Sequence, residues 1–274
     1  TSSYTFNKAS LNFTGDVIVD TDARLNLMHA DGMGRNTAQV TAGVIKVKDG
    51  GSLLVNVASG TTVTNNVELE GLGWKENVGQ LGAMRLVRGE FSGNILLTGD
   101  ARIGAWKGQE GTISGVISDG GGGYGIEKWG NGRLYLTGAS TYSGDTLVHG
   151  GQLQLANPNG PALYTDASNT DPDNLGRMAS PGKVIISHVE RARWDYPDVA
   201  ANLEFGEDHQ LGPKVDIVFD GVAGYSYMSL FDTEQEVGNL QAIGNDPGLM
   251  VLQNYEDSGL QDPNIGTGYN GAGT

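Results

Sequence analysis

The sequence predicts an all-β chain that folds as a right-handed parallel β-helix (β-solenoid) with loop insertions in its C-terminal half. Three observations support this fold class. Glycine supplies 44 of the 274 residues, and the apolar residues fall in short alternating runs of strand length. Residues 1–155 contain no proline, a residue that cannot donate to a β-ladder. The same residues show no apolar repeat of helical period over several turns, so we expect essentially no helix there.

The predicted strands are too short to be stable alone. Each has three to five residues and one inward face, so it must stack on the equivalent strand of the next coil, about 4.8 Å away. The first set lies at residues 16–19, 43–47, 66–69, 94–97 and 146–148. A second set lies at residues 183–186, 202–205, 215–219, 227–230 and 248–252.

A short cassette recurs in the first half: turn residues, a polar position, then two apolar residues separated by a spacer. It lies at residues 22–27, 50–55, 131–136 and 150–155, with a degenerate copy at 99–103. We expect its leucines to occupy equivalent positions in coils of roughly 20 to 30 residues. These leucines are Leu25, Leu53, Leu134 and Leu153.

The two halves differ in charge and proline content. Residues 1–156 contain 12 Lys+Arg and 14 Asp+Glu, whereas residues 157–274 contain 5 and 18, together with all eight prolines. We therefore expect regular solenoid coils over residues 1–156 and a continuing acidic, loop-rich solenoid over residues 157–274. Residues 157–174 are predicted to be a surface loop. The final residues, 266–274, are typical of a turn before another strand, so we expect the natural protein to continue.

Residues 125–155 carry a more specific pattern, in which a lysine precedes two glycines, alternating leucines and a Tyr-x-Gly-x-Thr segment. The segment resembles the autotransporter-associated β-strand repeat, also called the passenger-associated transport repeat. It departs from the usual pattern at Trp129, Ser140 and Asp145. The matching residues are Lys128, Gly130, Gly132, Leu134, Leu136, Thr137, Gly138, Tyr142, Gly144, Thr146, Val148, Gly151 and Leu153.

The resemblance implies a parallel β-helix in the passenger region of a large bacterial protein, secreted or held at the outer surface of a Gram-negative-type cell. It implies no catalytic residue. We expect a non-catalytic structural or adhesive segment that is able to self-assemble. Its partners would be neighbouring copies of itself, or host or cell-surface glycans or proteins. The alternative is a β-helical glycan-binding protein, or a lyase or hydrolase acting on extracellular polysaccharide.

Other function classes are disfavoured by composition. The formal net charge of −15 repels phosphate backbones, so nucleic acid is not an expected partner. No apolar run is long enough for a membrane-spanning helix. The sequence has no Gly-x-Ser-x-Gly motif for a serine nucleophile. The glycine run 120–123 lacks the features of a phosphate-binding loop and is expected to be a turn between coils.

No catalytic, cofactor-binding or metal-binding residue is therefore predicted, although three groups of residues allow other interpretations. Isolated histidines are unlike a zinc site, which needs three or four convergent ligands. An acidic loop has oxygens suited to Ca²⁺, but without a known calcium-loop spacing, and a solvated loop is favoured. The histidines are His29, His149, His188 and His209, and the loop residues are Asp166, Asn169, Asp171 and Asp173.

The glycan alternative depends on carboxylates, arginines and tryptophans that would have to converge in one groove of residues 183–231. Acidic surface is the favoured interpretation of the carboxylates, and packing under loops is that of the tryptophans. The carboxylates are Asp195 with Asp198, and Glu204 with Glu207 and Asp208. The arginines are Arg191 and Arg193, and the tryptophans are Trp74, Trp106, Trp129 and Trp194.

Overall fold

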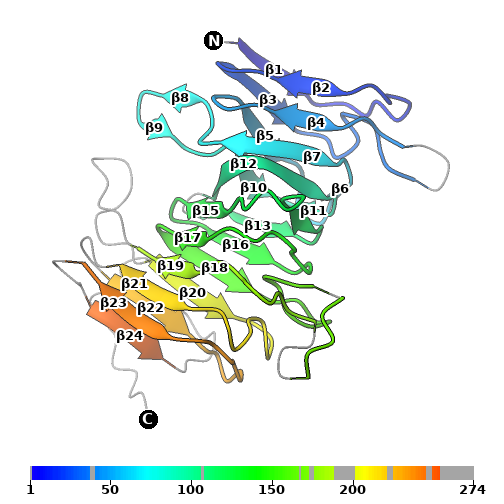
Figure 1. Cartoon of the computed structure of the whole chain (residues 1–274). Helices are drawn as coiled ribbons and strands as arrows, with labels where there is room; N and C mark the ends of the chain where they lie inside the picture. The colour runs from blue at the N-terminus through cyan, green and yellow to red at the C-terminus, as the bar shows by residue number, and fades with distance from the viewer. Residues whose placement is uncertain are drawn as a thin grey trace.

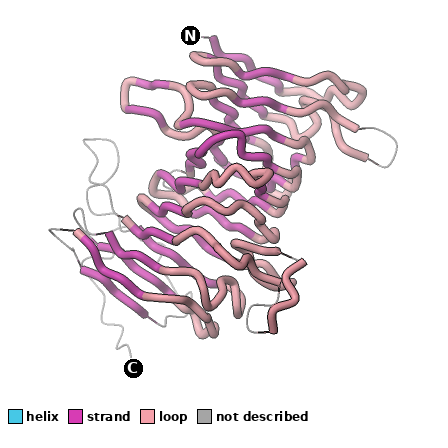
Figure 2. The backbone as a smooth tube through the Cα atoms, viewed as in Figure 1, coloured by secondary structure: helices cyan, strands magenta, loops and turns pink. Residues whose placement is uncertain are grey.

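The structure is a computed structural model that describes residues 2–37, 41–105, 108–166, 168–172, 176–187, 201–220, 225–244 and 249–253. These residues form 24 β-strands and no helix. The strands are stacked one upon another from the N-terminal to the C-terminal end (Figure 1), and loops link them around the stack (Figure 2). The predicted all-β parallel solenoid is confirmed.

Two large sheets contain all but two of the strands, and every strand pair within them is parallel. Sheet 1 has 14 strands and sheet 2 has eight. Sheet 1 contains β1 (Ser2–Phe6), β2 (Val17–Val19), β3 (Ala23–Leu27), β4 (Ile45–Val47), β5 (Ser52–Asn56), β7 (Val67–Gly71), β10 (Met84–Arg88), β12 (Ile95–Gly104), β14 (Ile117–Ser118), β15 (Ile126–Trp129), β17 (Thr146–Val148), β19 (Val184–Ile186), β21 (Ile217–Asp220) and β23 (Leu240–Ile243). Sheet 2 contains β6 (Thr62–Val63), β11 (Glu90–Phe91), β13 (Glu110–Ile113), β16 (Arg133–Leu136), β18 (Gly151–Leu155), β20 (Ala201–Phe205), β22 (Tyr225–Ser229) and β24 (Leu249–Gln253).

Successive coils contribute equivalent strands to the faces of the stack. In the N-terminal part, β4, β5 and β6 follow one another around a coil, and β7, β10 and β11 repeat that path in the next one. Strand β12 bends between two parts of sheet 1, since residues 95–97 pair with β7 and residues 101–104 pair with β15. Coils in this part therefore have three faces, and the strand ladders run along the stack.

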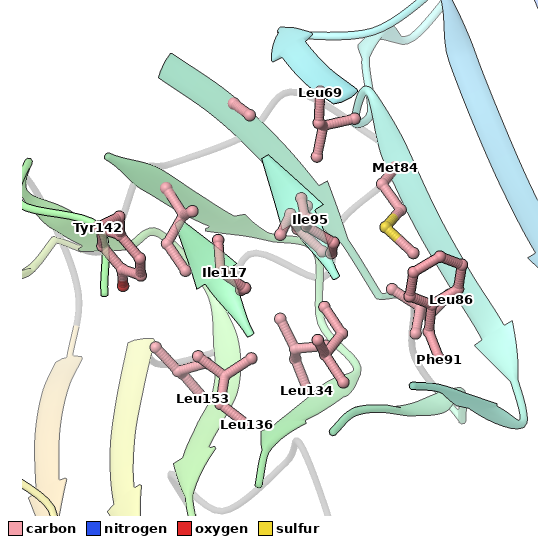
Figure 3. Close-up of a cluster of buried hydrophobic side chains, with 14 of the residues drawn as sticks. Leu69, Met84, Leu86, Phe91, Ile95, Ile117, Leu134, Leu136, Tyr142 and Leu153 are labelled. Carbon is pink, nitrogen blue, oxygen red and sulfur yellow. The ribbon is translucent and has the colours of Figure 1, made fainter. Parts of the chain in front are cut away.

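The core lies inside the coils and is built from side chains stacked in register. In sheet 1, Leu25 pairs with Leu53, and Leu53 with Met84. In sheet 2, Leu134 pairs with Leu153. These five side chains are at most 3% exposed. Figure 3 shows how such residues from both sheets converge on one interior.

The four cassette leucines are therefore not equivalent, and that part of the sequence interpretation was wrong. The cassettes at residues 22–27 and 50–55 form strands of sheet 1, whereas those at 131–136 and 150–155 form strands of sheet 2. Both sheets need an inward apolar residue at every second position, so they produce the same local pattern.

Asp and Asn side chains form a ladder at two corners of the coils, one ahead of each of the two parts of sheet 1 that β12 joins. Each side chain accepts a hydrogen bond from the backbone N–H at the equivalent position of the next coil. We call this set the corner ladder. Its pairs are Asp16 with Val44, Asn66 with Asn94, Asn94 with Val116, Asp100 with Gly125, Asp145 with Lys183 and Asp216 with Asn239, at 2.8 to 3.2 Å. The paired residues lie 22 to 38 positions apart, which sets the length of each coil.

Both sheets continue past residue 156, where the connections become longer. The link from β18 to β19 covers residues 156–183. The buried side chain of Gln210 ties the beginning of this link to a later coil, because its Nε2 donates to the carbonyl oxygens of Asn157 and Gly160. Its Oε1 accepts from the Asn157 N–H at 2.6 Å. The side-chain amide of Gln210 thus attaches the beginning of the excursion to a later coil.

Candidate interaction surfaces

The repeat segment places a lysine inside the core. Lys128 stands in register between Ile103 and Val148 and is completely buried. Its Nζ donates to the carbonyl oxygens of Gly130 at 2.6 Å and Gly150 at 2.7 Å. The second of these belongs to the following coil. A buried cation needs such partners, so Lys128 links the turns of two successive coils.

Two tyrosines of the same region form a buried hydroxyl chain. Tyr142 Oη lies 2.6 Å from Thr146 Oγ1, which lies 2.9 Å from Tyr164 Oη. Tyr164 in turn donates to the carbonyl oxygen of Lys183 at 2.9 Å. Burial raises the pKa of Tyr142, and the hydrogen bond to Thr146 only partly offsets this rise. Both phenols therefore remain neutral and serve as internal hydrogen-bonding groups.

The outer face of sheet 1 is covered by charged pairs that satisfy one another. Arg102 donates to both carboxylate oxygens of Glu127, at 3.0 and 2.9 Å, and stacks 3.7 Å from the centroid of the Trp129 ring. His149 lies between Glu127, at 3.2 Å, and the edge of Trp129. On neighbouring strands, Lys46 lies 2.9 Å from Asp16. This face is therefore already occupied by internal contacts.

A lateral hairpin formed by β8 (Lys75–Glu76) and β9 (Gly79–Gln80) leaves the stack between β7 and β10 (Figure 1). Sequence analysis did not predict it. Arg85 donates to Glu76 at 2.6 Å, and Arg24 stacks 4.5 Å from the centroid of the Trp74 ring. Arg102 also donates to the carbonyl oxygen of Gln80. Three arginines of sheet 1 thus hold the hairpin. The only sequence signal was the cluster of glycines around residues 71–82.

The outer face of sheet 2 has a different chemistry. Hydroxyl, phenol, amide and carboxylate groups follow one another in register along the stack, one from each successive strand. We call these residues the polar strip. They are Thr62, Glu90, Thr112, Tyr135 and Gln154, and all of them are partly exposed.

Buried polar residues lie beside the polar strip. Arg133 and Glu204 form an ion pair with 3.3 Å between Nε and Oε2, and their side chains are 3% and 0% exposed. Asn202 donates to Glu204 at 2.8 Å, and Ser229 donates to Asn202 at 3.0 Å. Arg133 also donates to the phenol oxygen of Tyr135 at 3.2 Å.

The structure separates the carboxylates that the glycan alternative grouped together. Glu204 is buried on β20, whereas Glu207 and Asp208 are exposed in the following turn. One oxygen of Asp208 accepts from the Glu234 N–H at 2.7 Å. These three acids do not converge, because alternation along a strand and the turn after it point them in different directions. Asp195, Asp198, Arg191 and Arg193 lie outside the described residues.

The histidines of the described residues lie apart from one another. His29 accepts from the Asp31 N–H at 3.1 Å and borders a shallow cleft, where Arg35 binds the Asp31 carboxylate with two hydrogen bonds. His149 lies on sheet 1, and His209 lies in the turn after β20. Among the described residues, no three His, Cys, Asp or Glu side chains are grouped in a way that could hold a metal ion. His188 lies outside them.

The acidic loop considered for calcium uses its oxygens within its own turns. Asp166 Oδ1 accepts from the N–H and hydroxyl of Ser168, and these hydrogen bonds keep the pKa of Asp166 below its usual value. Asn169 Oδ1 accepts from the Asp171 N–H at 2.9 Å. Asp173 lies outside the described residues, and the solvated loop favoured from the sequence remains a prediction.

The glycine run 120–123 is a turn, as predicted, but it joins β14 and β15, which are successive strands of one coil, and does not lie between two coils. The Asp119 carboxylate accepts from the N–H groups of Gly121 and Gly123 and from Ser143. Burial raises the pKa of Asp119, but these hydrogen bonds outweigh that effect and hold it below the usual value. The N–H groups of the turn therefore bind the Asp119 carboxylate of the same chain.

The two described tryptophans are not arranged in a common groove. Trp74 lies in the hairpin beneath Arg24, and Trp129 is 8% exposed beneath Arg102. Each ring is covered by a guanidinium group, whereas packing under loops was expected from the sequence. Trp106 and Trp194 lie outside the described residues.

Comparison with known proteins gives two similarities. Residues 126–155 match the family model of the passenger-associated transport repeat. The chain is also similar to the adhesin BmaC autotransporter of Brucella suis biovar 1 (strain 1330), with 31% identity over 167 residues. That alignment covers 59% of this chain and 4% of the relative. No solved structure matches, and the described residues include no helix suited to crossing a membrane.

The two similarities agree with the resemblance stated from the sequence. The matched segment contains the buried Lys128 and the Tyr142–Thr146 pair, so the most specific part of the pattern is a set of internal hydrogen-bonding groups. Passenger segments of this type lie outside the cell or at the surface of Gram-negative bacteria. The chain therefore carries the repeat of autotransporter passenger proteins, in a parallel β-solenoid.

Proposed function

We propose that this chain is a non-catalytic segment of a passenger protein that adheres to surfaces and holds other parts of the protein outward. The observation that carries this proposal is the use of polar groups within the fold. The buried side chains of Lys128, Tyr142 and Gln210 contact backbone or neighbouring side chains of the stack. A catalytic site would instead need acid and base groups that converge on a substrate.

The similarity to a protein named as an adhesin supports the adhesive part of this proposal. Beads coated with the purified 274-residue chain should bind to cultured host cells more strongly than beads coated with the heat-unfolded chain. Equal binding of the two preparations would contradict an adhesive role.

The non-catalytic part is tested separately with acidic and neutral polysaccharides. We expect no cleavage by the purified chain. If cleavage occurred and were abolished by Glu204→Gln or by Glu207→Gln, the segment would be an enzyme and the proposal would be wrong.

A further inference from the structure

We propose that the polar strip on sheet 2 binds a neutral glycan chain laid along the axis of the stack. This inference rests on the proposed adhesive function and names the class of partner. The centre of the strip consists of Thr112 on β13, Tyr135 on β16 and Gln154 on β18, which are in register on adjacent strands. Strand spacing of about 4.8 Å is close to the advance per sugar in an extended pyranose chain. Successive sugars would thus meet successive side chains.

Two of these three side chains have hydrogen-bonding groups that the fold leaves unused. Within the described part of the chain, Thr112 Oγ1 and the Gln154 amide make no hydrogen bond, although both residues are partly exposed. A hydroxyl and an amide together supply donors and acceptors. Sugar hydroxyls can also donate and accept hydrogen bonds. They can therefore pair with these two side chains, and neither partner carries a charge.

The third side chain, Tyr135, is held in place by Arg133. Arg133 Nη1 donates to Tyr135 Oη, and the guanidinium lies 5.7 Å from the centroid of the Tyr135 ring. Since the phenol oxygen accepts this bond, its own proton is left to donate outward. Arg133 is fixed by the buried Glu204, which also accepts from Asn202. A buried ion pair is expensive to desolvate, and here it fixes the phenol that faces the ligand.

The charge around the strip selects a neutral glycan over an acidic one. Glu90 lies in the strip between Thr62 and Thr112, and Glu110 is exposed on β13. The chain as a whole carries a formal charge of −15. Uronate or sulfate groups would be repelled at this surface, and nearby Arg133 is neutralised by Glu204.

The polar character of the strip also favours a glycan over a protein. Protein interfaces are usually built around exposed aromatic or aliphatic side chains. Among the described residues, the large hydrophobic side chains that are exposed lie elsewhere. They are Tyr4, Leu11, Phe13, Ile18, Met28, Leu72, Leu96, Leu240 and Ile243. Shallow surfaces of hydroxyl, amide and phenol groups suit sugars, because each hydrogen bond orients one hydroxyl.

The test is calorimetric titration of the whole chain with cellohexaose and mannohexaose as neutral probes and with hexagalacturonate as the acidic one. We expect at least one neutral probe to bind and the acidic probe not to bind. The double variant Thr112→Val with Gln154→Ala should lower the affinity for that neutral probe roughly tenfold, since each lost hydrogen bond weakens binding about twofold to twelvefold. The matched control is Gln241→Ala, on the exposed strand β23 of sheet 1, which should bind like the unaltered chain.

A second variant and the bead assay complete the test. Tyr135→Phe should also weaken binding, with the circular dichroism spectrum compared to verify folding. Absence of binding to either neutral probe, equal binding of hexagalacturonate, or unchanged affinity in the double variant would overturn the proposal. If beads coated with the double variant still adhered fully to cells, the adhesive function would stand and the strip would not be its site. If unaltered beads did not adhere, the proposed function itself would fail.

Discussion

Replacing Lys128 tests whether the repeat is held together by its buried lysine. In Lys128→Met, the side chain keeps its length in a stack whose adjacent members, Ile103 and Val148, are apolar. The carbonyl oxygens of Gly130 and Gly150 lose their ammonium partner. Each buried acceptor left without a partner costs about 1–3 kcal/mol. Removal of the buried charge offsets part of this cost, because the charge no longer has to be desolvated on folding. We expect a net loss of about 2–4 kcal/mol in the free energy of unfolding.

The measurement is unfolding in guanidinium chloride followed by circular dichroism. Lys48→Met is the matched control, because Lys48 is 42% exposed and lies 3.4 Å from Glu70 on the surface. Exposed pairs of this kind contribute about 0–1 kcal/mol, so its unfolding midpoint should barely move. If Lys128→Met proved as stable as the unaltered chain, or more stable, the lysine would not link the two coils and the reasoning would be refuted.

Three further predictions concern the core, the corners and the glycines. Tyr142→Phe removes the hydroxyl bonded to Thr146 and should cost about 1 kcal/mol in chemical unfolding; a neutral effect would contradict the hydroxyl chain. Asp216 has a pKa below its usual 3.8 because of the Asn239 backbone N–H. Its stabilising effect is therefore present above that pH and is lost as the pH falls through the folded-state value, so thermal melts of Asp216→Asn should lose part of their acid sensitivity. In Gly111→Ala, the added Cβ would lie 2.3 Å from the Leu86 Cβ. We expect the free energy of unfolding to fall by about 1–3 kcal/mol because of overpacking. An unchanged melting temperature would show that the coil shifts to accommodate the added methyl group.

The stacked architecture was predictable because it depends on features that are local in the sequence. Residues 1–155 lack proline and show alternating apolar residues, and these features describe a continuous ladder. The repeat at residues 125–155 added the parallel direction of pairing. Each predicted strand in this part also lies within or next to an observed one.

Which sheet a strand joins was not predictable from the same pattern. Leu53 and Leu134 stand in matching cassettes but belong to different sheets. The choice depends on how many residues fill the corners between strands, and the polar residues of those corners carry little periodicity. The corner ladder did leave a signal, since Asp16, Asn66 and Asn94 each come directly before a short apolar strand.

The candidate surface could be predicted only in part. Arg133, Tyr135 and Gln154 are ordinary spacer positions in the sequence, and their alignment appears once β16, β18 and β20 are in register. The pairing of Arg133 with Glu204 joins residues 71 positions apart across two strand pairings. A single sequence does not specify such contacts, because the register of β20 on β18 cannot be inferred across the long link after β18.

The corner ladder allows the stack to be maintained while the loops on its surface change. Its hydrogen bonds form whether the two partners are 22 or 38 positions apart, at 3.2 and 2.8 Å. A segment inserted between two rungs leaves both anchoring points where they were, provided it begins and returns at the same corner. Lineages are thus free to exchange whole loops, such as the excursion between β18 and β19, as independent modules. New recognition properties can then be acquired without redesign of the stack that carries them.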